Sequence, residues 1–155
     1  MKVGRRVDYA LRALCYLAGQ GDRVVTCTEI QARQAVPPHF LSKILRRLVA
    51  AGVLESVPGA RGGFRLGRPA DRITVREVYQ CIEGRLSLID CVERQDEFCC
   101  FASVCAQRHV WRRAQQVLLD YLESVTIREI ADREGLVPRL AEEVTHSVSR
   151  PLDRN

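Results

Sequence analysis

The segment from Pro37 to Gly52 constrains the fold most, because two adjacent prolines, an amphipathic stretch and a glycine mark both ends of one helix. Proline favours the first turn of a helix, and glycine favours the position just past its end. We therefore expect a helix over residues 38–51. Its apolar face carries Phe40, Leu41, Ile44, Leu45, Leu48 and Val49. Its opposite face carries His39, Ser42, Lys43, Arg46 and Arg47.

Two more helices are expected ahead of this one. Apolar residues recur at steps of three and four along residues 3–18, which predicts an amphipathic helix that ends near Gly19. Thr26 followed by Glu29 has the form of a capping box and predicts a short helix up to the proline pair. The chain therefore begins with three consecutive helices.

A basic hairpin is expected next. Residues 53–57 and 64–66 have the composition of strands, and the turn between them is rich in glycine. Arg61 lies in this turn and Arg65 in the second strand. Three helices followed by a hairpin predict a mainly α fold with a small β-wing, which is a winged helix-turn-helix.

The second half of the chain has one long periodic segment. Thr74 and Glu77 form another capping box and predict a helix to about residue 82, and residues 86–103 show no period and predict a loop. Beyond them, apolar residues seven apart predict a long helix from Val104, with a stripe that suits dimerisation. The members of this seven-residue series are Val104, Trp111, Leu118 and Val125.

Charge is distributed unevenly along the chain. Residues 1–72 hold 13 Lys and Arg against 5 Asp and Glu, a net charge of +8, whereas residues 73–155 carry −3. A basic block of this kind is either a solvated surface or the electrostatic footprint of a nucleic-acid binder. Combined with the helix pattern, it favours double-stranded DNA. The candidate contacts are His39, Ser42, Lys43, Arg46 and Arg47 for the major groove, with Arg61 and Arg65 for the adjacent minor groove.

Seven cysteines point to metal or redox chemistry. The chain has no apolar run of membrane-spanning length and no signal-peptide pattern, so we expect a cytoplasmic protein with no membrane association, where structural disulfides are rare. The spacing of Cys91, Cys99 and Cys105 allows three thiolates to converge on one centre, with Cys100 as an alternative to Cys99. Zinc sites more often use closely paired cysteines, so an iron-sulfur cluster is favoured. His109 is an alternative ligand, four residues beyond Cys105.

The segments RRVDYALRAL, FLSKILRRLVAAGVLESV and GARGGFRLGR, with three cysteines ahead of the long helix, resemble the Rrf2 family of bacterial regulators. This family includes the iron-sulfur cluster regulator, the nitric-oxide-sensing repressor and the rhizobial iron regulator. The resemblance covers about residues 1–135. It implies a homodimer on a palindromic operator, with a cluster on Cys91, Cys99 and Cys105 in each subunit, four-iron four-sulfur in preference to two-iron two-sulfur. It also implies Asp8 of the other subunit as a candidate fourth ligand.

These expectations divide the chain into three parts. Residues 1–72 form the DNA-binding domain, residues 73–135 hold the cluster-binding loop and dimerisation helices, and residues 136–155 form a C-terminal tail. The function expected is a dimeric transcription regulator that senses iron, redox state or nitric oxide.

Two alternatives remain open. In one, the cysteines form a zinc site or a thiol switch. In the other, the winged helix binds a protein partner and there is no cluster. An enzyme is not expected, because the sequence has no phosphate-binding glycine loop and no nucleophile motif.

Overall fold

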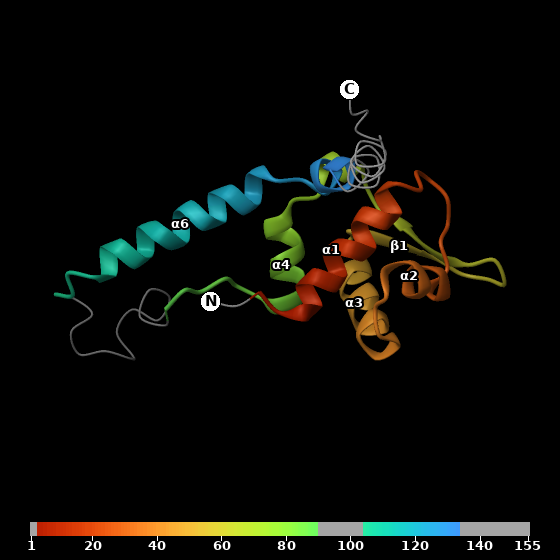
Figure 1. Ribbon diagram of the computed structural model, residues 1–155, viewed down its shortest axis with the longest axis horizontal. Helices are drawn as coiled ribbons and strands as arrows, with labels where there is room; N and C mark the ends of the chain where they lie inside the picture. Colours follow the sequence, from red (N-terminus) through yellow and green to blue (C-terminus); the bar gives the residue numbers. More distant parts are fainter. Residues whose placement is uncertain (1–2, 90–103, 134–155) are drawn as a thin grey trace, which may run out of the picture.

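The structure, a computed structural model, describes residues 3–89 and 104–133 of the 155-residue chain. In chain order its elements are α1 (Arg5–Ala18), α2 (Cys27–Gln34), α3 (Pro38–Ala50), β1 (Leu54–Val57), β2 (Gly63–Leu66), the 3-10 helix η1 (Ala70–Arg72), α4 (Val75–Glu83) and α6 (Arg108–Ser124) (Figure 1). Residues 127–133 are also helical. The predicted fold, mainly helical with a small two-stranded wing, is confirmed.

Side-chain caps fix the start of α2 and of α4. The Thr26 hydroxyl accepts a hydrogen bond from the Glu29 backbone N–H at 3.1 Å, and the Thr74 hydroxyl accepts one from the Glu77 N–H at 3.2 Å. Such caps satisfy N–H groups that have no partner inside the helix. Both glutamate side chains form ion pairs with arginines, Glu29 with Arg23 and Glu77 with Arg68, so each cap relies on its threonine.

The hairpin is joined to the helical part of the fold by a backbone bridge. Val25, just before α2, exchanges two hydrogen bonds with Phe64 of β2, at 2.9 and 2.8 Å. A Cβ atom on the neighbouring Gly63 would lie only 2.3 Å from the Val25 carbonyl oxygen. Glycine at this position therefore permits the close approach that holds the wing beside α2.

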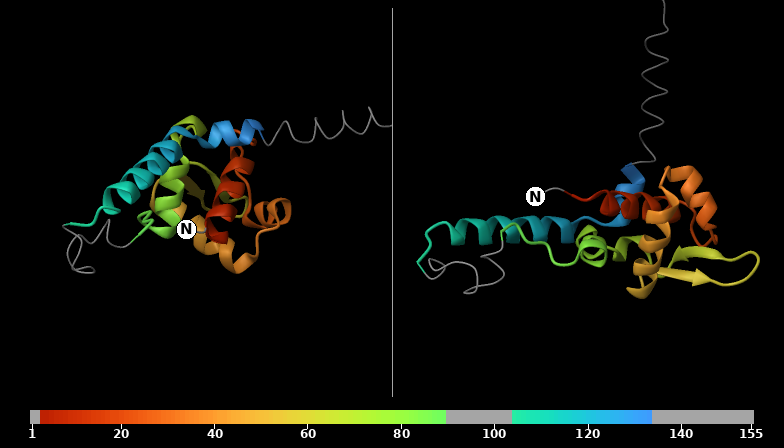
Figure 2. Two further views of the ribbon diagram at one scale, coloured as in Figure 1. Left: turned by 60° about the vertical axis from the view of Figure 1, so that its left-hand side comes forward. Right: turned by 90° about the horizontal axis from the view of Figure 1, so that it is seen from below.

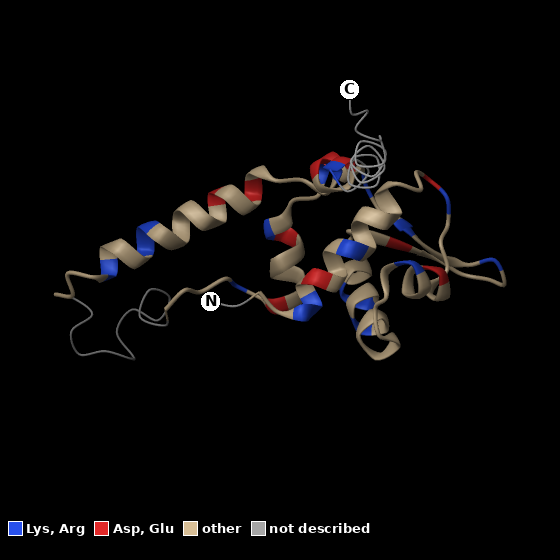
Figure 3. Ribbon diagram, viewed as in Figure 1, with Lys and Arg blue, Asp and Glu red and all other residues tan. Residues whose placement is uncertain are grey.

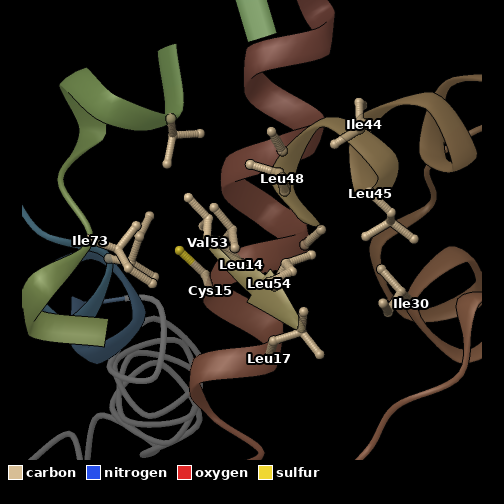
Figure 4. Close-up of a cluster of buried hydrophobic side chains, with 14 of the residues drawn as sticks. Leu14, Cys15, Leu17, Ile30, Ile44, Leu45, Leu48, Val53, Leu54 and Ile73 are labelled. Atoms are coloured by element: carbon tan, nitrogen blue, oxygen red, sulfur yellow. The ribbon is translucent and has the colours of Figure 1, made fainter. Parts of the chain in front are cut away.

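One apolar core unites the N-terminal elements with α4 (Figure 4). Leu14 of α1, Leu48 of α3 and Ile73 ahead of α4 are all fully buried in it. Ile127, which follows α6, is buried in the same core. The division of the chain after residue 72 stays a prediction, and the structure adds that α4 packs against α1 and α3.

Helix α6 extends away from this core in all three views (Figures 1 and 2). It begins at Arg108, four residues later than the seven-residue series suggests, and none of its side chains is buried. Its C-terminal end is anchored by backbone hydrogen bonds from Val75 N–H to Val125 O and from Ile127 N–H to Ile73 O, both 2.9 Å long. Across the described residues, no helix has the length and apolar character needed to cross a membrane.

Candidate nucleic-acid interface and sensor segment

Burial of one face of α3 determines which side chains it presents to solvent. Leu41, Ile44, Leu45 and Leu48 are buried against the core. The five α3 side chains predicted to contact the major groove lie on the opposite, exposed face: His39, Ser42, Lys43, Arg46 and Arg47. Figure 3 shows the basic positions along α3 and at the tip of the wing.

The exposed face of α3 has a definite order. Because each residue of a helix turns by about 100°, Ser42 lies at one border, Arg46, His39 and Lys43 lie in the middle, and Arg47 lies at the other border. Ser42 borders the groove between α3 and the wing, and Arg47 borders the cavity between α3 and α4. The middle of the face is thus the part most open to a large ligand.

The cations on this face differ in their partners. Within the described part of the chain, Lys43 and Arg46 form no ion pair. The Arg47 guanidinium instead donates a hydrogen bond to the carbonyl oxygen of Ile82 at the end of α4. The Ser42 hydroxyl donates to the Pro38 carbonyl at 3.2 Å. Lys43 and Arg46 therefore have the most freedom to bind an external anion.

A groove of about 330 Å³ separates α3 from the wing. Val49 and Phe64 provide apolar lining, and Ser42 and Arg46 lie at the groove on α3. Cys27 also lines it, and partial burial raises the pKa of its thiol. This environment keeps the thiol protonated at neutral pH, as expected for a packing residue.

The two wing arginines have different environments. Arg61 is exposed in the turn at the tip of the hairpin. Arg65 donates two hydrogen bonds to the Glu55 carboxylate, at 3.0 and 3.2 Å, and lowers the pKa of that carboxyl. Since side chains alternate along a strand, this pair lies on the opposite face of the hairpin from Ser56 and Phe64, which line the groove beside α3. Of the two, Arg61 is therefore the better placed to extend the surface of α3.

The residues predicted to hold a cluster are only partly described. Cys91, Cys99 and Cys100 lie outside the described residues. Cys105 is half-buried just ahead of α6, and its carbonyl oxygen accepts a hydrogen bond from the Arg108 N–H at 3.2 Å. His109 is exposed in the first turn of α6.

The start of α6 corrects one step of the sequence argument. Because Cys105 precedes the helix, its four-residue spacing from His109 does not place the two side chains on one helical face. Asp8 is exposed on α1 and pairs with Arg12 at 3.1 Å. Within residues 3–89 and 104–133, no three His, Cys, Asp or Glu side chains gather as a metal site.

A short segment connects α4 to the cysteine region. Gly84 has a φ of +87°, which ends α4, and Leu86 is buried. The Leu88 backbone N–H then donates to the Gln115 side-chain oxygen at 3.0 Å. Residues 84–89 therefore run between the end of α4 and the flank of α6 immediately before Cys91.

The fold and the basic face of α3 define a winged helix-turn-helix protein. Residues 3–133 match the Rrf2 family, described as "Iron-dependent Transcriptional regulator", and the chain belongs to this family. The resemblance recognised in the sequence is confirmed, and the protein is a transcription regulator. Its relatives are regulators rather than enzymes, as expected.

Three relatives, two of them with solved structures, align with most of this chain. The transcriptional regulator NsrR of Bacillus licheniformis is 28% identical over 141 residues, which is 90% of this chain and 99% of NsrR. CymR, named the global cysteine regulator of B. subtilis, is 25% identical with a TM-score of 0.71, covering 86% of this chain and 98% of CymR. T. potens IscR is also 25% identical, with a TM-score of 0.67, covering 86% of this chain and 88% of IscR.

Proposed function

We propose that this regulator binds double-stranded DNA with the exposed face of α3 in the major groove and Arg61 of the wing beside it. The observation that carries this proposal is the pair Lys43 and Arg46, two exposed cations without an ion-pair partner among the described residues. Arginine and lysine donate hydrogen bonds to guanine edges and neutralise phosphates. His39 and Ser42, nearer the N-terminus of α3, complete the proposed base-reading set.

The exposed apolar side of α6 supports a homodimer. Val110, Trp111, Val117 and Tyr121 are large and exposed, with Tyr121 62% accessible. A contiguous apolar surface on a projecting helix indicates a partner, and a second copy provides the same stripe. A two-fold dimer would present two α3 helices to half-sites about one helical turn of DNA apart.

The sensor of the proposed regulator is an iron-sulfur cluster held by Cys91, Cys99 and Cys105, with Cys100 as the alternative to Cys99. Thiolates are the ligands such clusters prefer, and Cys105 is half-buried at the N-terminal side of α6. Four irons are favoured over two. When bound, the cluster would supply one iron that oxidants or nitric oxide can attack or that the cluster can lose.

The fourth ligand in this proposal is Asp8 of the other subunit, with His109 as the alternative. Both side chains are exposed in the single chain. Asp8 would have to exchange its ion pair with Arg12 for the metal. An oxygen or nitrogen ligand makes one iron easier to displace than a fourth thiolate does, which suits a cytoplasmic sensor.

Anaerobic purification tests the sensor directly. We expect brown protein with visible absorption and acid-labile sulfide, and loss of both iron and sulfide on replacing any one of Cys91, Cys99 and Cys105 by serine. Cys81→Ser is the matched control, because Cys81 lies in α4 with its thiol pKa raised by burial. Colourless wild-type protein with stoichiometric zinc, or with neither metal, would support the zinc or thiol-switch alternative.

Salt-dependent DNA binding tests the interface. We expect Lys43→Ala with Arg46→Ala to weaken binding to any duplex and to flatten the slope of log K against log salt by roughly 1.8, for two phosphate contacts. Arg112→Ala with Arg113→Ala on α6 removes the same charge and should leave the slope unchanged. Absence of salt-dependent binding in the wild type would contradict the proposal and favour the alternative in which the winged helix binds a protein partner.

A further inference from the structure

A basic cavity of about 390 Å³ lies where α1, α3 and α4 meet. Four cationic side chains line it: Arg6, Lys43, Arg46 and Arg47. Apolar side chains line the rest, namely Phe40, Ile44 and Ile82, and the His39 ring lies tilted against that of Phe40 with ring centroids 4.2 Å apart. Such a combination suits an anion with an apolar body, because the cations attract the charge while the apolar lining packs against the remainder.

The end of α4 holds two of the four cations. Arg6 Nη2 lies 3.0 Å from Glu83 Oε2, and Arg47 donates to the Ile82 carbonyl oxygen. The backbone at Gly4 lies against the same carboxylate, since a Cβ atom there would be 2.8 Å from Glu83 Oε1. Glu83 therefore forms an ion pair with Arg6, which is one of the cations that an external anion would bind.

Glu83 is also the last residue of α4 before the segment that leads to the cysteines. Gly84 turns the chain, and residues 85–89 reach α6 through the hydrogen bond between Leu88 and Gln115. A rearrangement of this segment would move the Glu83 carboxylate relative to Arg6. The ion pair between Arg6 and Glu83 thus lies between residues 84–89, which lead to the cysteines, and the exposed face of α3.

We propose that this cavity binds a phosphate of the DNA backbone, and that Glu83 competes with that phosphate for Arg6. The inference rests on the proposed DNA-binding function and adds a phosphate site with its own regulation. The deoxyribose packs on the apolar lining, and the phosphate oxygens take donors from Arg6, Lys43 and Arg46. While Glu83 holds Arg6, its negative charge repels the phosphate. Displacement of residues 84–89 frees Arg6 and strengthens binding.

Glu83→Gln tests this competition in the full-length protein with a fluorescein-labelled duplex of mixed sequence. We expect binding about threefold tighter than wild type, and a slope of log K against log salt that is steeper by roughly 0.9, for one more phosphate contact. Arg6→Gln should change both quantities in the opposite direction. In the double variant Arg6→Gln, Glu83→Gln, the gain in affinity should disappear.

Glu129→Gln is the matched control, because Glu129 pairs with Arg133 at 2.7 Å in the helical residues 127–133, away from this cavity. Equal affinities and slopes for Glu83→Gln and Glu129→Gln would overturn the proposed site while leaving wild-type DNA binding intact. Loss of salt-dependent binding in the wild type itself would instead refute the function on which the site rests. Should Glu83→Gln fail to fold, Arg6→Gln with an unchanged slope is the contradicting result.

Inorganic phosphate distinguishes the two sources of the anion. Because both anions would use the same donors, replacing chloride by phosphate at constant ionic strength should weaken DNA binding by the wild type more than by Arg6→Gln. If the wild type binds inorganic phosphate through Arg6 and its affinity for DNA does not change, the cavity is a site for the free ion, and its assignment to the DNA backbone is wrong.

Discussion

Glu29 shows how single side chains stabilise the DNA-binding part of the molecule. Its carboxylate accepts hydrogen bonds from Arg23, at 2.6 and 3.1 Å, and from the Tyr16 hydroxyl at 2.7 Å. The bonds from Arg23, followed by the one from Tyr16, lower the pKa of Glu29 from 4.5 to about 2. The Glu29 carboxylate of α2 thereby binds side chains of both α1 and the loop after it.

The pH dependence of stability follows from this pKa. Because the folded-state pKa is depressed, the contribution of Glu29 is present above about pH 4.5 and is lost as pH falls towards 2. We expect Glu29→Gln to lower the thermal midpoint at pH 7, with the difference from wild type shrinking below pH 4.5 and vanishing near pH 2. Asp71→Asn, at an exposed carboxylate outside the ion pairs of the described residues, should show a smaller difference at pH 7. This role of Glu29 would be contradicted if Glu29→Gln lowered the thermal midpoint by the same amount at pH 7 and at pH 3.

At this scale, the sequence predicts which side chains are exposed better than it predicts their partners. The period of α3 identifies Lys43, Arg46 and Arg47 as one face, and all three are exposed. It cannot show that Arg47 reaches Ile82, 35 residues away, because that contact depends on how α4 packs. Arg6 was missed for the same reason, since only the fold brings α1 beside the face of α3.

At the scale of elements, local signals account for most helix boundaries. The Thr26 and Thr74 caps and the proline pair before α3 predict where these helices begin, because each signal acts within four residues. The start of α6 differs from its prediction, since a seven-residue apolar series continues through Val104 without specifying where the backbone becomes helical. Cys91, Cys99 and Cys100 lie outside the described residues, so their convergence stays a prediction.

The exposed stripe of α6 predicts how the protein associates. We expect Val117→Lys with Tyr121→Lys to shift the protein from dimer to monomer in sedimentation velocity, because both side chains are exposed on the apolar side of the helix. Burying two charges in a dimer interface is strongly unfavourable. Gln116→Lys, on the opposite side of α6, should leave the dimer intact. A monomeric wild type at micromolar concentration would contradict the dimer.

At the scale of the whole molecule, α4 connects the helices α1 and α3 to α6 and to the segment that leads to the cysteines. It packs in the same core as α1 and α3, contacts α6, and ends beside Arg6 and Arg47. The segment that follows it leads to Cys91. A change at the cysteines is therefore expected to reach the DNA-binding face through a short, continuous path, and two such states would differ in DNA affinity.

The dissociation constant for DNA, measured anaerobically before and after removal of iron with a chelator, tests this coupling most directly. Duplexes enriched from a random-sequence pool by the protein itself serve as targets at a fixed salt concentration. We predict that the iron-loaded and iron-free forms differ by about tenfold or more, and that Cys105→Ser abolishes the difference. Equal affinities of iron-loaded and iron-free wild-type protein would contradict the account.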